Sequence, residues 1–429
     1  MLSGGRGSQL GPAMGAALPS VVAPVAVRRP ENMSAWYAIA AILVYVVFRL
    51  LHLARSPKAP VLRGKDQKYV QYLLKQCPML TEIYCPPKLW GRSGHFQSVI
   101  HSLVGRVRCP KAANGDRIAL YASDGALFTY ELYKPYHDNG KEVILAVCPG
   151  IGNSSETLYI QAFVHYIQIK GLHCAVLNHI GTLSNVQPTT PRIFSYGHTE
   201  EFQLMVDDLC DRYPDSQIVC IGFSMGGNIV SKYLGSCPTI PSQIVGGISV
   251  CQGYDATRAM NHLLDWENLR RVYFYIMTEW MKALIMRHKS LLLSPIVKDK
   301  YGLEETRIVS AATMIELDEE YSRKVHGFDS VMDFYRHQSS AYFLDQIKHP
   351  MVFVNALDDP IVPPPLLDCI REHASAHEKV LYIETEFGGH LGFFEGGIIL
   401  PKPHSWMDHL IVQISNALTE QPQLMKATS

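Results

Sequence analysis

Apolar runs alternate with amphipathic segments over most of the chain, and this alternation predicts the class of fold. The apolar runs cover residues 142–148, 217–223, 351–356 and 380–384. Consecutive apolar positions are typical of strands that are buried on both faces. Segments with helical periodicity cover residues 200–213, 226–234, 366–373 and 406–418. Strands and helices in alternation predict an α/β fold, with a mostly parallel sheet and helices on both of its faces.

Two segments depart from this alternation. Residues 116–133 have strand character on both sides of a Ser-Asp-Gly sequence, which predicts a β-hairpin. Residues 256–346 are rich in helical patterns, and we interpret them as a helical cap inserted into the domain. Large apolar side chains are concentrated there: Trp266, Tyr273, Phe274, Tyr275, Met277, Trp280, Met281 and Met286. We expect most of them to fill a helical core and some to line an apolar pocket.

The N-terminal residues differ from the rest of the chain. Residues 1–32 are rich in Gly, Ala, Pro and Val without a periodic pattern, which is typical of a disordered tail. Residues 33–48 carry no charge, and the apolar run continues past Arg49 to residue 54. This length is close to that of a membrane-spanning helix. The segment 33–54 is therefore predicted to be a transmembrane signal-anchor, because a cleaved signal peptide would begin nearer the N-terminus.

The charges that flank this segment bear on its orientation. Basic residues precede it at Arg6, Arg28 and Arg29 and follow it at Arg49, Arg55, Lys58, Arg63 and Lys65. By the positive-inside rule, the side with more basic residues stays in the cytosol. Taken alone, these charges predict that the residues after the anchor face the cytosol.

Composition limits the classes of partner. Lys plus Arg and Asp plus Glu both number 39, so the formal net charge is zero and no nucleic-acid partner is expected. Hydrophobic residues make up 47% of the chain, which is enough for the core of one large domain. The ten cysteines are irregularly spaced, without a metal-ligand pattern. We therefore predict no metal and no cofactor.

One pentapeptide, Gly-Phe-Ser-Met-Gly, carries the first candidate for chemistry, with Ser224 at its centre. It follows an apolar run and opens a helical segment. This is the context of a nucleophile elbow, in which a serine lies on a tight turn between a strand and a helix. A serine between glycines is more often a simple turn residue. The strand before it and the helix after it favour Ser224 as a nucleophile.

In this kind of site the acid and the histidine follow the serine along the chain. Asp358 and Asp359 come just after the apolar run 351–356, and His390 comes soon after the run 380–384. All three lie beyond the carboxyl ends of predicted strands, where open α/β sheets place their chemistry. The histidine would accept the serine proton, and a carboxylate would fix its tautomer. We prefer Asp359, because the Asp-Pro-Ile-Val-Pro that it begins leads directly into the next element. Asp358 is the alternative.

The loop after the run 142–148 is the candidate for an oxyanion hole. In hydrolases of this kind, one amide comes from such a loop and the other from the residue after the nucleophile. The backbone N–H groups of Ile151 and Met225 are therefore the predicted donors. A dinucleotide-binding loop is the rival interpretation, because a Gly-x-Gly follows a strand here. Ser155 stands where the third glycine would be required, which disfavours that interpretation.

Several motifs together carry a resemblance to a known family. They occupy residues 88–97, 148–151, 175–179, 222–228, 249–254, 355–360 and 388–395. With them, the chain from about residue 79 to 418 resembles the α/β-hydrolases, within a family of membrane acylglycerol lipases and ester hydrolases. The resemblance implies an α/β-hydrolase fold and assigns the nucleophile, acid and histidine to Ser224, Asp359 and His390.

The resemblance also bears on the membrane. It implies a single-pass type II protein, at the cell surface or in the endomembrane system, with its domain on the luminal or extracellular side. This is opposite to the orientation that the flanking charges predict. In the type II orientation, the sequon at Asn153 is a candidate glycosylation site. A glycan there would lie beside the predicted oxyanion loop.

Together these features predict a membrane-anchored serine hydrolase that cleaves carboxylic esters, in particular an acylglycerol lipase that takes a lipid ester from the bilayer. Two alternatives stay open. One is a lipid acyltransferase, in which a second alcohol replaces water, although the chain has no histidine followed five positions later by aspartate. The other is a membrane receptor that binds a steroid or lipid regulator and has secondary esterase activity.

Overall fold

The computed structural model describes residues 33–106, 109–137 and 140–420. The predicted disordered tail, residues 1–32, lies outside the described residues. The chain divides into two units, Met1–Val47 and Phe48–Ser429, and each is described by itself.

The described part of the first unit is helical. Helix α1 (Met33–Leu50) continues into the first residues of the second unit. The helix ends before the predicted segment 33–54 does, because residues 51–54 form turns and His52 has a left-handed backbone with φ 51°. Among the described residues, no helix has both the length and the apolar composition needed to cross a membrane.

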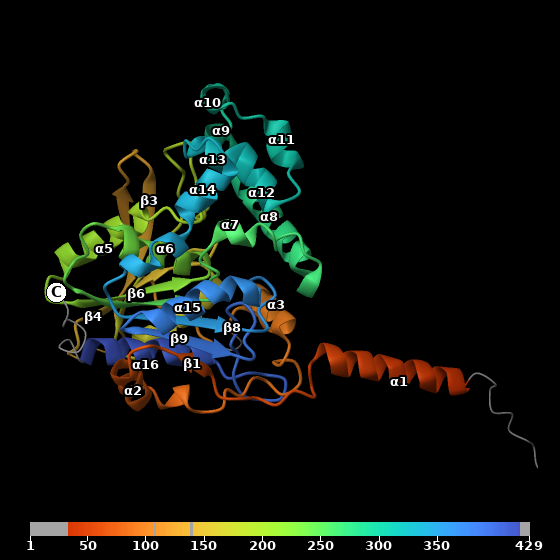
Figure 1. Cartoon of the computed structure of the whole chain (residues 1–429). Helices are drawn as coiled ribbons and strands as arrows, with labels where there is room; N and C mark the ends of the chain where they lie inside the picture. Colours follow the sequence, from red (N-terminus) through yellow and green to blue (C-terminus); the bar gives the residue numbers. More distant parts are fainter. Residues whose placement is uncertain (1–32, 107–108, 138–139, 421–429) are drawn as a thin grey trace, which may run out of the picture. The chain divides into compact units, whose positions relative to one another are not determined.

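A single nine-stranded sheet forms the centre of the second unit's described residues (Figure 1). Its strands are β1 (Val61–Arg63), β2 (Asp116–Tyr121), β3 (Leu127–Tyr133), β4 (Val143–Cys148), β5 (His173–Asn178), β6 (Gln217–Phe223), β7 (Ile244–Val250), β8 (Met351–Ala356) and β9 (Val380–Thr385). Their order across the sheet is β1-β9-β8-β7-β6-β4-β5-β3-β2.

The pairing of these strands confirms the predicted α/β fold with a mostly parallel sheet. Strands β4 to β9 pair in parallel with one another. Strands β2 and β3 form the predicted hairpin, and β3 joins β5 in the antiparallel sense. Strand β1 pairs antiparallel with β9 at the other edge. The carboxyl ends of the parallel strands therefore share one edge of the sheet.

Helices cover both faces of the sheet. They are α2 (Gln67–Gln76), α3 (Gly94–Val104), α4 (Leu158–Ile169), α5 (Glu200–Arg212), α6 (Met225–Ser236), α15 (Asp368–Ala376) and α16 (Trp406–Glu420), with short 3₁₀ turns η1 (Pro78–Leu80) and η6 (Pro364–Leu367). Successive strand residues face opposite sides. Leu145 of β4 belongs to an apolar core shared with α2, α4 and α16. The next residue, Ala146, belongs to a second core shared with α5, α6 and α15.

Between β7 and β8 the chain forms a separate group of helices, of which α8 to α14 lie together at the top of Figure 1. They are α7 (Ala256–Ala259), η2 (Glu267–Leu269), α8 (Arg270–Arg287), α9 (Lys289–Leu292), α10 (Pro295–Tyr301), α11 (Glu305–Ser310), α12 (Met314–Leu317), η3 (Asp318–Ser322), α13 (Arg323–Val325), α14 (Val331–Gln338), η4 (Ser340–Tyr342) and η5 (Leu344–Gln346). We call this group the cap. Asn228 of α6 holds its base, because its Nδ2 donates to Gln338 O and its Oδ1 accepts from Ser340 N, both at 2.8 Å.

Two helices near the reactive edge were not predicted from the sequence. Helix α4 lacks a polar face, because most of its side chains are buried, and so it has no amphipathic period to read. Helix α3 is short and its sequence mixes polar and apolar residues. Both are identified only by their packing, α3 against α4 and α4 against the sheet.

A buried ion pair joins α16 to the segment after α3. Arg106 Nε and Nη2 donate to Asp408 Oδ2 and Oδ1 at 3.0 and 3.2 Å. Arg106 Nη1 also donates to Gly392 O at 3.1 Å. Burial by itself would raise the pKa of Asp408, but the charge and hydrogen bonds of Arg106 hold that pKa below its ordinary value. The ion pair therefore links two elements that are distant in sequence.

Replacing Asp408 by alanine should destabilise the fold strongly, because Arg106 would keep a buried charge without its counter-ion. We expect the free energy of unfolding to fall by about 3–5 kcal/mol, measured by urea denaturation. The pKa of Asp408 is lower in the folded than in the unfolded protein. Its carboxylate therefore contributes fully to stability above the unfolded pKa of about 4, and this contribution is lost as the pH falls through the lower folded pKa. Glu395→Gln, which breaks the partly exposed pair with Lys402, is the control and should cost under about 1 kcal/mol. Equal losses in the two variants would contradict this account.

Candidate active site

Ser224 occupies the turn between β6 and α6. Its φ of 52° and ψ of −123° are unfavourable for a residue with a Cβ atom and cost about 1–3 kcal/mol. Two backbone hydrogen bonds hold this geometry: Ser224 N donates to Val250 O, and Gly227 N donates to Ser224 O, both at 2.8 Å. The sequence therefore folds locally as a nucleophile elbow, with the serine at the carboxyl edge of the sheet.

The second glycine of the pentapeptide is required by close packing. A Cβ atom on Gly226 would lie 2.0 Å from the carbonyl oxygen of Cys148, at the end of β4. The first turn of α6 thus passes directly against the strand that leads to the predicted oxyanion loop. This contact brings the loop after β4 close to Ser224.

The three predicted triad residues come together at the ends of β6, β8 and β9. Ser224 Oγ lies 2.8 Å from His390 Nε2, and His390 Nδ1 lies 2.8 Å from Asp359 Oδ2. Asp359 is 1% exposed. Its Oδ1 accepts hydrogen bonds from the amides of Ile361 and Val362 at 2.8 and 3.0 Å. This arrangement provides a path for a proton from the serine hydroxyl to the imidazole, with a carboxylate that fixes the ring.

Asp358, the alternative acid, has a different set of contacts. Its Oδ1 accepts from Gly389 N at 2.8 Å, and its buried Oδ2 has no hydrogen-bond partner among the described residues. Burial raises the pKa of Asp358 to about 8, which favours the neutral form of the carboxyl group. Asp358 therefore braces the residue before His390, while Asp359 bonds the imidazole.

The two predicted oxyanion donors border the same pocket as the serine. Ile151, Met225 and Ser224 all line it. Met225 is the first residue of α6, so its N–H has no acceptor within the helix. The amide of Gly150, in contrast, is engaged, because it donates to the hydroxyl of Tyr159 at 3.2 Å. The geometry leaves Ile151 and Met225 as candidate donors.

Helix α3 holds the histidine loop, which sequence reasoning missed. Ser98 Oγ accepts from His390 N at 2.8 Å, and Gln97 Oε1 accepts from Phe394 N at 2.9 Å. Gly389 has φ +56°, and a Cβ atom there would come within 2.5 Å of a backbone oxygen at the start of α3. The available signal was the motif that ends in Gln97, which carried the resemblance but had no assigned role.

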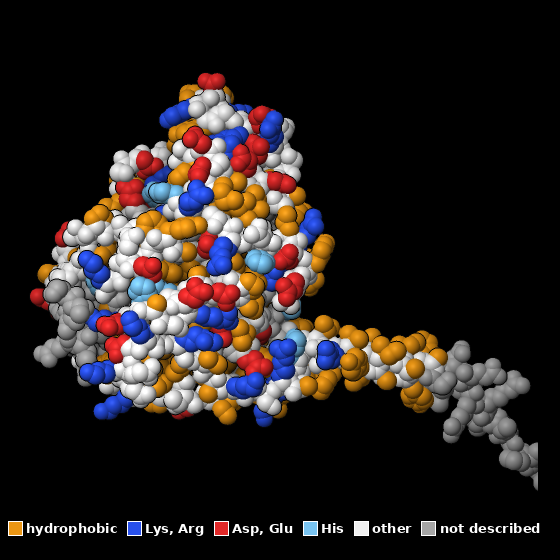
Figure 2. Space-filling view, viewed as in Figure 1, with side chains coloured by type: hydrophobic (Ala, Val, Ile, Leu, Met, Phe, Trp, Pro, Cys, Tyr) orange, Lys and Arg blue, Asp and Glu red, His pale blue; other side chains and the backbone are white. Residues whose placement is uncertain are grey.

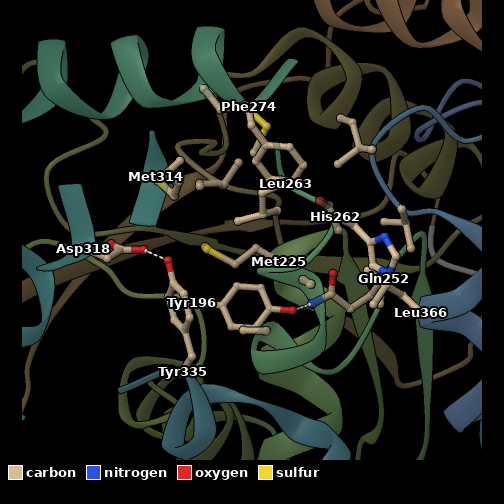
Figure 3. A pocket seen from close by; sticks show the side chains of 18 of the residues that line it. Tyr196, Met225, Gln252, His262, Leu263, Phe274, Met314, Asp318, Tyr335 and Leu366 are labelled. Carbon is tan, nitrogen blue, oxygen red and sulfur yellow. Dashed lines mark hydrogen bonds between the residues drawn. The ribbon is translucent and has the colours of Figure 1, made fainter. Parts of the chain in front are cut away.

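A pocket of about 1040 Å³, including its open mouth, has Ser224 and His390 in its wall. Figure 3 shows part of its lining, with Met225 near the centre. One face of α8 contributes to the pocket through Phe274, Met277 and Met281. These positions bear out the expectation that some apolar side chains of the cap line a pocket. Trp266, Tyr275 and Trp280 are instead exposed, so the expected helical core does not include them.

Two groups of described residues bring metal-binding side-chain types together. Cys251 lies beside Asp359 and His390, whose polar atoms already bond each other. In the second group, His373 Nδ1 and His377 Nε2 lie 3.2 and 3.0 Å from the same oxygen of Asp345. In both groups a histidine already contacts a carboxylate.

Asn153 lies in the loop after β4. Its backbone N–H donates to Gly150 O at 3.1 Å, and its side-chain Oδ1 accepts from the hydroxyl of Tyr159 at 3.2 Å. The side chain is half-buried beside the predicted oxyanion loop. Its glycosylation, like the type II orientation on which this depends, stays a prediction from the sequence.

Comparison with known proteins agrees with the fold. The family model described as alpha/beta hydrolase fold matches residues 143–397, which include Ser224, Asp359 and His390. The chain therefore belongs to the α/β hydrolase fold family. The match begins at β4 and covers every strand that carries a residue of the site.

Within this family, the chain is similar to named relatives over most of its length. It is 46% identical over 394 residues to abhydrolase domain-containing protein 2 of Drosophila melanogaster, covering 92% of this chain and 99% of the relative. It is 41% identical over 388 residues to monoacylglycerol lipase ABHD2 of Homo sapiens, covering 89% and 91% of the two chains. An esterase structure from Pyrococcus furiosus aligns with a TM-score of 0.42 at 15% identity, covering 66% of this chain and 90% of the esterase. The two named relatives confirm the resemblance found in the sequence.

The two neighbouring aspartates should differ sharply when each is replaced by asparagine. Asp359→Asn should lower kcat on a soluble p-nitrophenyl ester by about 10⁴-fold, because the imidazole would lose the carboxylate that fixes its tautomer. Asp358→Asn should lower kcat by less than about 10-fold, because asparagine resembles the neutral acid that burial favours there. The reverse ranking would assign the triad acid to Asp358.

Proposed function

We propose that this protein is a membrane-attached serine hydrolase that cleaves the carboxylic ester of acylglycerols, with Ser224, His390 and Asp359 as its catalytic triad. The observation that carries the proposal is the pair of 2.8 Å contacts that link these three side chains, with Ser224 and His390 in the wall of a large pocket. The named similarity to monoacylglycerol lipase ABHD2 over about nine-tenths of both chains supports the substrate class.

In the first half of the reaction, Ser224 Oγ attacks the ester carbonyl carbon as His390 Nε2 takes the hydroxyl proton. The N–H groups of Ile151 and Met225 stabilise the oxyanion, and each such donor is worth about 3–4 kcal/mol. The bond to the alcohol then breaks, and His390 gives its proton to the departing oxygen. Asp359 stabilises the imidazolium throughout, and the acyl group stays on Ser224.

Water completes the reaction through the same groups. It attacks the acyl-enzyme carbonyl while His390 takes one of its protons. The bond from the carbonyl to Ser224 Oγ breaks, the serine recovers its proton from His390, and a fatty acid is released. Because every proton passes through His390, this scheme needs no further ionisable group.

The lining of the pocket supports a lipid ester over a polar one. Apolar side chains make up most of the wall, with contributions from α8, from the segment before it and from the loop after β8. A buried CH₂ group gains about 0.8 kcal/mol on leaving water, so an acyl chain would be held by many small contributions. Figure 2 shows acidic and basic side chains interspersed over the visible face of the second unit, which offers no single-sign patch for a polyanion.

Membrane attachment is the part of the proposal that rests on sequence. Residues 33–48 carry no charge and belong to α1, in which apolar side chains occupy every side of the helix. A helix that is apolar all round favours burial in protein or lipid. We therefore propose that residues 33–54 attach the protein to a membrane, where long-chain acylglycerols reside.

A fluorophosphonate probe tests the nucleophile. Ser224→Ala should abolish covalent labelling and lower ester turnover by several orders of magnitude, because the attacking oxygen is removed. Ser310→Ala, an exposed serine of the cap, is the matched control and should label like the wild type. Labelling and turnover that survive in Ser224→Ala would refute the proposed mechanism.

Removing the N-terminal segment tests the role of attachment. A protein that begins near Ser56 should hydrolyse short soluble esters at a rate similar to the full chain. It should lose much of its activity on long-chain monoacylglycerol in vesicles, because such substrate partitions into lipid and little is free in water. Undiminished vesicle activity would show that attachment does not deliver the substrate.

A further inference from the structure

The pocket that holds the serine also holds a carboxyl group. In Figure 3, Asp318 and Tyr335 lie toward one end, and Leu366 lies toward the other with Gln252 and His262. Ser224 and His390 line the same pocket. An ester bound at Ser224 would therefore share this pocket with the groups of both ends.

The end with Leu366 offers apolar contacts to an acyl chain. Leu366 packs with Val362 and with the partly buried Ile361, and all of them line the pocket. Arg270 also lines the pocket. Its Nη1 donates to Asp265 at 3.4 Å, whereas its buried Nε and Nη2 have no hydrogen-bond partner among the described residues, and Nη2 lies 3.8 Å from Glu267.

The other end presents a carboxyl group to the pocket. Tyr335 Oη donates to Asp318 Oδ2 at 2.6 Å, as the dashed line in Figure 3 shows. Asp318 begins η3 (Asp318–Ser322), a single π-helical turn directly after α12, and such turns are frequent at functional sites. The side chains of Asp318, Ser322 and Tyr335 all line the pocket.

This carboxyl group has hydrogen-bond partners but no counter-ion. No Lys, Arg or His of the described residues forms an ion pair with Asp318, and no charged neighbour contributes to its pKa. The side chain is half-buried, so a carboxylate there depends on hydrogen bonds for its stabilisation. A carboxylate can accept about four hydrogen bonds, so the contacts with Tyr335 and Ser322 leave capacity for a ligand.

We propose that Asp318 and Tyr335 form a subsite that binds a hydroxyl group of the alcohol half of the substrate. The inference rests on the proposed ester hydrolysis and adds the basis for choosing a polyol ester over a simple alkyl ester. Asp318 accepts a hydrogen bond from the substrate hydroxyl, and Tyr335 orients the carboxylate through its own bond. The acyl chain occupies the opposite end of the pocket, along Leu366.

Two other polar groups of the pocket are engaged with each other. Tyr196 and Gln252 line the pocket, and Gln252 Nε2 donates to Tyr196 Oη at 2.5 Å. Burial raises the pKa of Asp318 to about 6 and that of Tyr335 well above its usual value. At pH 7.5 the subsite therefore consists of an ionised acceptor and a tyrosine that keeps its proton.

The experiment compares substrates that share an acyl chain. For the full-length protein in detergent micelles, we measure kcat/KM on monooleoylglycerol and on ethyl oleate and take the ratio. Asp318→Asn and Tyr335→Phe should each lower this ratio by about 10- to 100-fold, because a site built for a hydroxyl discriminates through the bond it loses. Asp299→Asn, an exposed cap residue on α10, is the control and should leave the ratio within about 2-fold.

A third substrate tests which half of the ester carries the hydroxyl that the subsite recognises. The pH dependence then distinguishes substrate binding by Asp318 from a purely structural role of this residue. Ethyl 12-hydroxyoleate carries a hydroxyl on the acyl half, and its ratio to ethyl oleate should not change in Asp318→Asn. In the wild type, the monooleoylglycerol ratio should fall as the pH drops through about 6, where Asp318 becomes protonated. Tyr335 and Ser322 are the groups that face this carboxyl. The triad acts on both esters, so its titration cancels in the ratio, and Asp318→Asn should flatten the profile.

Three outcomes would overturn the subsite. They are an unchanged monooleoylglycerol ratio in both variants, a loss confined to the 12-hydroxyoleate ester, and a ratio that does not depend on pH near 6. Failure of the proposed function looks different, because wild-type protein would then cleave ethyl oleate but not monooleoylglycerol, or neither ester. Thermal unfolding of each variant, compared with Asp299→Asn, identifies a general loss of folding.

Discussion

The left-handed backbone of Ser224 is the constraint on which the site depends. A non-glycine residue with φ 52° is unfavourable by about 1–3 kcal/mol, and the hydrogen bonds to Val250 and from Gly227 hold it in place. This turn ends β6 and begins α6 within a single residue. It also forces the first turn of the helix against the end of β4, where Gly226 leaves no room for a Cβ atom. The same strained turn therefore positions the nucleophile, the free amide of Met225 and the neighbouring oxyanion loop.

Helix α3, which is not part of the sheet, fixes the backbone of the base His390. The loop after β9 places His390 beside Ser224, but its backbone is fixed by Ser98 on α3, almost three hundred residues earlier in the chain. The ion pair between Arg106 and Asp408 adds a second connection, because Arg106 also bonds the carbonyl of Gly392. The 2.8 Å contacts of the imidazole thus depend on polar groups that take no part in proton transfer. Such support is what keeps a catalytic constellation within the narrow range of productive geometry.

The cap supplies much of the wall of the pocket that contains Ser224. Its helices close a pocket over the carboxyl edge of a sheet that many hydrolases could share, and its walls differ from one end to the other. Leu263 of the cap and Leu366 of η6 provide apolar surface, whereas Asp318 and Tyr335 of the cap provide a half-buried acceptor and a hydroxyl that donates to it. The reactive residues lie on loops at the edge of the sheet, whereas much of the pocket wall comes from the inserted helices. This division is common where a rigid scaffold carries variable segments.

The sequence by itself predicted the α/β fold and the order of the reactive residues, because buried strands, glycine turns and strand ends are local patterns. Ser224, Asp359 and His390 each follow an apolar run closely, and parallel strands bring such positions to one edge. Only the tertiary structure distinguished the contacts of Asp358 from those of Asp359, since adjacent residues on a loop differ by side-chain direction alone. It also revealed Ser98, Arg106 and Asp318, whose partners lie far away in the chain or across a pocket. Reactive residues can be recognised from short segments of sequence. The residues that position them and line the pocket are brought together only by packing between distant segments.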